Sequence, residues 1–136
     1  MDFMKSLFVA ASGLKAQSGR MRVIAENIAN VDSTARTPNE DPYRRRIATF
    51  EAEFDQAMQA NKVVLGKVEN DRSDFNLKFI PGHPAADADG FVKTPNVDRL
   101  VEAVDMREAQ RTYEANLNVI TATRTMLART MDILRA

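Results

Sequence analysis

The stretch FMKSLFVAASGLKAQSGRMRVIAENIANV, residues 3–31, decides the fold of this chain. Apolar residues recur in it with alternating spacings of four and three, and Gln17 is the one polar residue in that series. This is the heptad pattern of a helix that holds one apolar stripe against a long partner. The sequence therefore predicts an N-terminal helix of about 40 Å, at 1.5 Å per residue, with another helix alongside it.

A second heptad series runs through the last 41 residues, where polar Gln110 and Arg124 interrupt it. We predict that the two series form an assembly interface between helices. Its N-terminal members are Leu7, Leu14, Met21, Ile24, Ile28 and Val31. Its C-terminal members are Met106, Tyr113, Leu117, Ile120, Leu127, Met131 and Leu134.

The prolines divide the chain into three parts. All five lie between Thr37 and Pro95, and the segments on either side contain none. Because proline costs about 3 kcal/mol inside a helix, the proline-free ends are the predicted helices. We expect an N-terminal helix within residues 1–31, a middle region over 32–95 and a C-terminal helix over 96–136. The last helix should begin near Thr94 to Asp98, where hydroxyl, amide and carboxylate side chains are suited to cap it, and run to about Leu134.

The middle region carries the patterns of short strands. Phe75, Leu77 and Phe79 alternate with polar residues, as in a half-buried strand. Two further candidates are Lys62–Val68, with Gly66 as a possible bulge, and Tyr43–Phe50. The series Phe50, Phe54, Met58 has helical spacing instead, so its state stays open. We expect turns at Pro81-Gly82 and Asp89-Gly90.

The fold class that follows is mainly α with a small β element. Long N- and C-terminal helices pack as a coiled-coil-like pair, and a short, β-rich and irregular region joins them. A chain of 136 residues is the size of one domain.

Composition excludes several classes of function. Lys plus Arg equals Asp plus Glu at 19 each, so no basic field favours nucleic acid. Cysteine is absent and His83 is the only histidine, which removes thiol chemistry and leaves one candidate histidine base. Paired carboxylates such as Glu51 and Glu53, or Asp71 and Asp74, lie in polar surroundings typical of solvated surface. We expect no enzyme activity, no catalytic residue, no metal site, no cofactor and no small-molecule substrate.

The first residues resemble a secretory signal because Lys5 precedes an apolar run. The unbroken run Leu7–Ala11 is shorter than the roughly 7 to 15 residues such a signal needs. We therefore expect this segment to remain in the mature protein. No segment approaches the roughly 18 apolar residues of a membrane span, so we expect a chain that is soluble before assembly.

Two charged motifs have alternative interpretations. Asp87-Ala-Asp89-Gly90 lacks the further ligands of a calcium loop, so we interpret it as a turn. Arg44-Arg45-Arg46 is flanked by acidic residues, and we predict that these arginines meet carboxylates on a neighbouring subunit. His83, between Gly82 and Pro84, is expected to be exposed or to serve packing.

Several short motifs, in order, resemble those of the flagellar rod and hook axial protein family, with the spacing of its proximal rod members. The first motif is IAENIAN, which contains Asn27, Ala29 and Asn30, followed by Thr37 and Pro38. The others are Pro42-Tyr43-Arg44-Arg45, then ADADGFVK at 86–93, then Pro95-Asn96-Val97-Asp98, then RTYEAN with Tyr113 and Asn116. Thr37-Pro38 stands apart from Tyr43, whereas many rod and hook proteins have a compact Thr-Pro-Gly-Tyr.

The resemblance implies a structural component of the bacterial flagellar basal body. It implies a place in the periplasm-spanning rod, a tubular drive shaft that transmits torque for motility. It further implies type III export of unfolded subunits without a cleaved signal peptide. The partners would be the export apparatus, other copies of the chain and sister flagellar rod proteins, with the terminal helices forming the inner tubular layer.

Three alternatives stay open. One is a two-helix hairpin that closes within a single monomer. Another is a soluble helical adaptor or export chaperone that binds one partner helix; its monomer would resist proteases, whereas a free polymer subunit would have sensitive ends. The third is a membrane-surface protein, which the balanced charge of the C-terminal helix disfavours.

Overall fold

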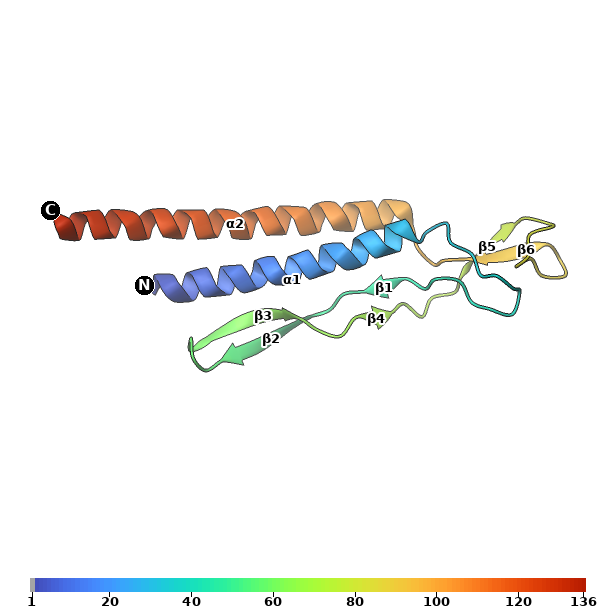
Figure 1. The fold of residues 1–136 in the computed structure, drawn as a ribbon, viewed down its shortest axis with the longest axis horizontal. Helices are drawn as coiled ribbons and strands as arrows, with labels where there is room; N and C mark the ends of the chain where they lie inside the picture. Colours follow the sequence, from blue (N-terminus) through green and yellow to red (C-terminus); the bar gives the residue numbers. More distant parts are fainter. Residues whose placement is uncertain (1) are drawn as a thin grey trace.

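The computed structural model describes residues 2–136 and shows an elongated molecule (Figure 1). Two helices dominate it, α1 at Phe3–Ala29 and α2 at Arg99–Arg135. They lie antiparallel and side by side, with both chain ends at one end of the molecule and α2 extending past the start of α1 (Figure 1). The predicted fold class is confirmed: two long terminal helices pack as a pair, and a small strand-containing region joins them.

Each helix begins at an aspartate that caps it. The Asp2 carboxylate accepts hydrogen bonds from the backbone amides of Met4 and Lys5. The Asp98 carboxylate accepts from those of Leu100 and Val101, so α2 starts where its capping residues predict. In both cases the side chain satisfies amides that have no partner within the first turn.

Several small residues of the two helices are buried. Ala10, Ala16 and Ala109 are buried, with Ala109 fully so. A Cβ atom added to Gly13 would lie 2.8 Å from the side-chain nitrogen of Asn116, which places the two backbones close together. Because the approach is this close, small residues pack best at the centre of the contact.

The hairpin of β2 (Phe50–Asp55) and β3 (Ala60–Leu65) covers the other side of α1. Its antiparallel register runs from Phe50 opposite Leu65 to Asp55 opposite Ala60. The Val63 amide donates to the Ser12 hydroxyl at 3.1 Å. A Cβ atom on Gly19 would lie 2.8 Å from the Leu65 side chain. The layers therefore run α2, α1, hairpin, with α1 in the middle (Figure 1).

Two smaller sheets complete the middle region. Strand β1 (Arg46–Ile47) pairs antiparallel with β4 (Glu69–Asn70) alongside the last turns of α1. Strand β5 (Asn76–Phe79) pairs antiparallel with β6 (Phe91–Thr94) and projects beyond the helices at the end opposite the termini (Figure 1).

Several strand predictions need correction. The strand expected over Tyr43–Phe50 is shorter than predicted, because only Arg46–Ile47 and Phe50, the start of β2, belong to strands there. The strand expected over Lys62–Val68 lies two to three residues earlier, and the Gly66 amide donates to the Thr49 carbonyl just after it. The open segment from Phe50 forms β2 and then a turn that ends at Gln59, which has a φ of 51°.

The strand from Phe75 exists, but it is not half-buried. Leu77 and Phe79 are 64% and 61% exposed, because this two-stranded sheet has no helix packed on it. Its partner β6 was not expected at all. Pairing across the intervening turns is a non-local contact that the alternation within one segment does not reveal.

Both predicted turns are confirmed. Gly82 and Gly90 have φ values of 89° and 86°, a conformation that glycine adopts without steric cost. The Asp87 carboxylate accepts from the amides of Asp89 and Phe91 and so closes the second turn. His83 is half-buried and accepts from the Ala85 amide at 3.0 Å, which agrees with its expected packing role.

Candidate functional site

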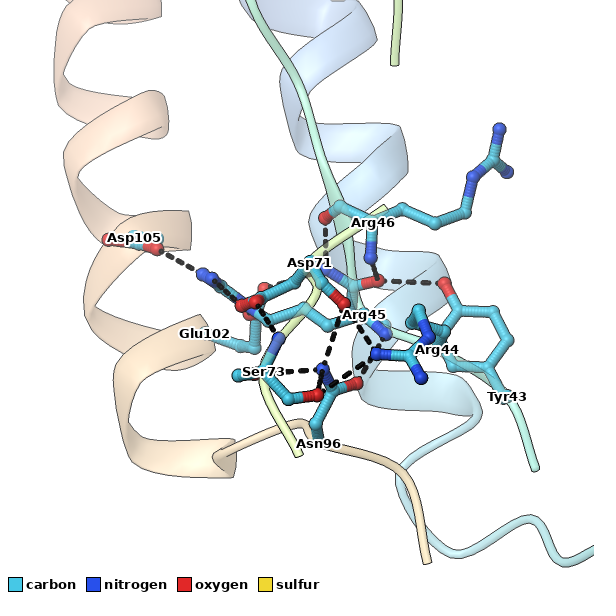
Figure 2. A network of polar contacts seen from close by, with 10 residues as sticks. Tyr43, Arg44, Arg45, Arg46, Asp71, Ser73, Asn96, Glu102 and Asp105 are labelled. Atoms are coloured by element: carbon cyan, nitrogen blue, oxygen red, sulfur yellow. Dashed lines mark hydrogen bonds and ion pairs between the residues drawn. The ribbon is translucent and has the colours of Figure 1, made fainter. Parts of the chain in front are cut away.

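Polar side chains from distant parts of the chain meet where the helices join the middle region (Figure 2). We call this cluster the polar junction. It unites the end of α1, the segment around β1, the segment after β4 and the first turns of α2. Its members are Asn27, Tyr43, Arg44, Arg45, Arg46, Asp71, Ser73, Asn96, Glu102 and Asp105.

Asn27, on α1, lies at the centre of the junction and is 1% exposed. Its Nδ2 donates to the Arg46 carbonyl at 2.8 Å and to Glu102 Oε2 at 3.2 Å. Its Oδ1 accepts from the Tyr43 hydroxyl at 2.7 Å and from the Arg46 amide at 3.0 Å. The side chain thus makes all four hydrogen bonds open to an amide, and it takes the place of a strand partner for residue 46.

Glu102 is the most deeply buried charged group, with 1% of its surface exposed. A lone carboxylate is costly to bury, and a hydrogen-bonded partner of opposite charge offsets that cost. Arg45 Nε lies 2.5 Å from Glu102 Oε1 and supplies this partner. The same guanidinium reaches Asp71 at 3.3 Å and Asp105 at 3.5 Å, so one arginine joins the middle region to two positions on α2 (Figure 2).

Asn96, just before α2, joins backbone segments through its side-chain amide, as Asn27 does. Its Oδ1 accepts from the Arg45 amide at 2.7 Å. Its Nδ2 donates to the Asp71 and Ser73 carbonyls and, at 2.9 Å, to the Ser73 hydroxyl. Arg44 donates to the same two carbonyls at 2.9 Å and lies 4.2 Å from the centre of the Phe75 ring, a cation–π contact.

The electrostatics follow from these contacts. Burial opposes the charge of Arg45, but hydrogen bonds and charges of Glu102 and Asp71 outweigh it and raise the Arg45 pKa. The backbone amide of Ser73, then its hydroxyl and Arg45, lower the pKa of Asp71. Burial raises the pKa of Tyr43. The side chains of the junction therefore hold its backbone segments in place through hydrogen bonds and ion pairs with one another.

The structure gives the arginines partners within the same chain. They were expected to meet carboxylates on a neighbouring subunit, but Arg45 pairs with acidic residues of its own chain. Arg46 pairs with Glu26 of α1 at 2.8 Å, and Arg44 binds carbonyls. The reason is topological, since folding brings residues 71–73 and 102–105 beside residues 44–46.

The motif residues divide between the junction and other places. Asn27, Tyr43, Arg44, Arg45 and Asn96 meet in it, and Pro42, Pro95 and Val97 are buried. Asn30 donates to the Glu26 carbonyl at the end of α1, whereas Ala29 is exposed. Thr37 and Pro38 lie in an exposed loop, where Thr37 accepts from the Glu40 amide. Asp98 caps α2, and Tyr113 and Asn116 are half-buried on it.

Sequence reasoning missed the acidic half of the junction. The arginines were not predicted to contact Glu102, Asp71, Glu26, Asp105 or Ser73. Glu102 had a signal in the sequence, because it stands seven residues before Ala109 and fourteen before Asn116, on the same helical line. Asp71 had no such signal in the sequence, since only the fold brings it near Arg45.

The residues predicted for the assembly interface fall into two groups. Ile24 is buried, and a second set is half-buried beside the helix contact: Leu7, Leu14, Met21, Val31, Met106, Tyr113, Ile120 and Leu127. The others are exposed: Ile28 at 36%, Leu117 at 46%, Met131 at 50% and Leu134 at 81%. The first group lies along the pair within the chain, and the second is available to other molecules.

Neither described helix is long and apolar enough to cross a membrane. Within residues 2–136, no three Asp, Glu or His side chains are grouped so as to hold a metal ion.

Known proteins are similar in sequence to this chain over almost its whole length. The flagella basal body rod protein family matches residues 7–36, which form most of α1 and the loop after it. The family described as flagellar basal body rod FlgEFG protein C-terminal matches residues 88–133, from the last turn of the middle region through α2. The two matches thus include most of both helices and the Asn27, Asn96 and Glu102 positions of the junction.

Individual relatives match the chain over nearly its whole length. The flagellar basal-body rod protein FlgC of Agrobacterium fabrum is 51% identical, covering 94% of this chain and 92% of that protein. FlgC of Bacillus subtilis is 38% identical, covering 98% and 99%. FlgC of Salmonella typhimurium is 36% identical, covering 92% of each. Matches of this extent, on a fold that brings the shared motifs together, show that the chain belongs to the FlgC family of flagellar basal-body rod proteins.

Proposed function

We propose that this chain is a structural subunit of the flagellar basal-body rod and has no enzyme activity. In this role it polymerises through its terminal helices into a tubular drive shaft that transmits torque for motility. Membership of the FlgC family supports the rod as its place. The observation that carries the mechanism is the apolar surface left exposed on α2, where Leu117, Met131 and Leu134 are 46%, 50% and 81% exposed.

The C-terminal part of α2 is little covered by the rest of the monomer. Beyond Thr123 no residue of this helix is buried, and Leu127 alone is half-buried. A single helix gains little stability from its own backbone and depends on packing of an apolar face. Assembly would supply that packing, because exposed apolar surface of this extent is typical of protein interfaces.

The proposal extends to partners and location. The partners are other copies and sister rod proteins, which touch the assembly interface on both helices. The site of action is the rod across the periplasm, reached through the flagellar export apparatus without a cleaved signal peptide. Nucleic acid and small-molecule substrates have no part in this role.

The test begins with a strain that lacks the gene and carries an epitope-tagged copy of the chain. We expect the deletion to abolish swimming, the tagged copy to restore it, and purified basal bodies to contain the chain. A motile deletion strain, or basal bodies free of the chain, would contradict the proposal. A stable one-to-one complex with one cytoplasmic protein would favour the adaptor instead.

A further inference from the structure

A second apolar stripe runs along α2, apart from the residues predicted for assembly. Val119, Met126 and Ile133 recur every seventh residue. Ala115 precedes Val119 by four residues, Ala122 follows it by three, and Arg129 follows Met126 by three. The three larger side chains are 48%, 44% and 75% exposed, and both alanines are exposed. Spacing of four and three over this length is the pattern of a helix that lies along a second helix.

This stripe does not face α1. Val119 follows the half-buried Asn116 by three residues, and Met126 follows the buried Thr123 by three. At about 100° per residue, three residues place the stripe roughly 60° around the helix from the α1 contact. Leu117 lies on the other side, roughly 100° from Asn116. We call Leu117 and Met131 the first edge of α2, and Val119, Met126 and Ile133 the second edge.

The two edges match each other. Both repeat every seven residues, and the second edge is displaced from the first by two residues, or about 3 Å of helix. Two parallel α2 helices at nearly the same height therefore bring Leu117 of one beside Val119 of the other, and Met131 beside Ile133. Arg124 interrupts the first edge, but its long aliphatic stem can cover Met126 while its charge remains in water.

The charges next to the edges are complementary. Arg111 and Arg129 lie next to the second edge on the side away from α1, and Glu114 and Asp132 lie next to the first edge on that same side. In each case the acid follows the arginine by three residues, about 4.5 Å along the helix. None of the four has an ion pair within the described chain, residues 2–136. A parallel neighbour would bring arginines and acids together along one groove.

From this match we infer that the second edge of α2 docks against the first edge of α2 in another copy of the same chain. The inference rests on the proposed function and specifies which surfaces of the subunits meet. Because the two surfaces differ, the contact is heterologous and repeats from copy to copy, as a ring or helical tube requires. Each α2 is then covered by α1 and by one neighbour on either side.

Cysteine cross-linking tests this directly, since the chain has no cysteine of its own. The doubly substituted chain L117C/V119C is expressed in the deletion strain, and purified basal bodies are treated with a short bismaleimide. We expect dimers and higher multiples of the chain on denaturing gels. L117C or V119C alone should give no homodimer, because each contact joins unlike positions. The control L117C/N118C, whose second cysteine leaves the edge, should also stay monomeric.

The pair M131C/I133C provides an independent second test should the first variant fail to assemble. The inference is overturned if neither double variant cross-links in assembled basal bodies, if V119C alone cross-links to itself, or if the product contains only a different protein. Absence of the unsubstituted chain from basal bodies would overturn the proposed function and this inference together. Presence without cross-linking would overturn the inference alone.

Discussion

The polar junction and the C-terminal half of α2 are opposite kinds of surface on one molecule. At the junction, Asn27 and Glu102 are 1% exposed, and their polar atoms engage groups of the same chain. Along α2 from residue 117 to 135, large apolar residues such as Ile133 and Leu134 are 75% and 81% exposed. The polar groups of the junction are therefore paired within the monomer, whereas the end of α2, which extends past the start of α1 (Figure 1), leaves apolar side chains exposed.

The two surfaces therefore have different roles: the junction determines the shape of the subunit, and the exposed part of α2 supplies the free energy of assembly. Hydrogen bonds and buried ion pairs are directional, so the junction fixes how the middle region sits on the helices. Apolar burial is non-directional and grows with the area removed from water. A subunit whose polar junction is paired internally, and whose C-terminal half of α2 exposes apolar residues, keeps its shape while it gains stability from neighbouring subunits. The predictions below test this division through the free energy of unfolding of the isolated chain.

The largest expected effect is at the centre of the junction. Arg45→Ala leaves the Glu102 carboxylate buried without its partner, and removing one member of a buried pair costs about 3 kcal/mol. We expect a loss of that size in the free energy of unfolding, measured by urea denaturation followed by circular dichroism.

The matched control is Arg46→Ala. Its ion pair with Glu26 involves side chains that are 42% and 41% exposed, and such pairs contribute at most about 1 kcal/mol. Equal losses in the two variants would show that the junction is not the structural centre of the monomer.

The next effect concerns the helix contact. Gly13→Val adds a branched side chain where even a Cβ atom would lie 2.8 Å from Asn116, so the helices must move apart. Overpacking of this kind costs about 1 to 3 kcal/mol, measured by the same denaturation. The double variant G13V/N116A makes room and should recover much of the loss. An unchanged stability in Gly13→Val would mean that the helices do not pack this closely.

A smaller effect depends on pH. Contacts with Ser73 and Arg45 lower the pKa of Asp71 in the folded chain, so its charge stabilises the fold above the unfolded pKa of about 4. That contribution is lost as the pH falls from about 4 through the lower folded value. Asp71→Asn should therefore lose less stability than the unsubstituted chain between pH 5 and pH 2.5, in urea titrations at each pH. Identical pH profiles would show that Asp71 does not contribute to the pH dependence of stability.

The smallest effect on the monomer should accompany a complete loss of function. Leu117 is 46% exposed, so Leu117→Glu should change the free energy of unfolding by no more than about 0.5 kcal/mol. In the assembled rod the same change would force a charge into an apolar contact, so we expect no swimming in soft agar. Asn118→Glu, one position along, is the control and should swim. Normal motility of Leu117→Glu would contradict the proposed interface.

Sequence reasoning reached the fold class because its signals are local. The heptad series, the proline-free ends and the capping aspartate at 98 act within a few turns of one helix, and α1 and α2 formed where they indicated. The turns at Gly82 and Gly90 were likewise readable, because a positive φ is a property of one residue. The family motifs were also visible, although their shared location was not.

Only the tertiary structure decided which groups meet. The pairing of β5 with β6, the binding of Asn27 to residues 43, 46 and 102, and the pairing of Arg45 within its own chain all join segments far apart in sequence. The same holds for the face of α2 that meets α1, where Asn116, and not the larger Leu117, lies against Gly13. The sequence by itself determined where helices begin and which residues seek burial. The fold determined their partners, because distance and packing between remote segments are not encoded in the spacing of any one of them.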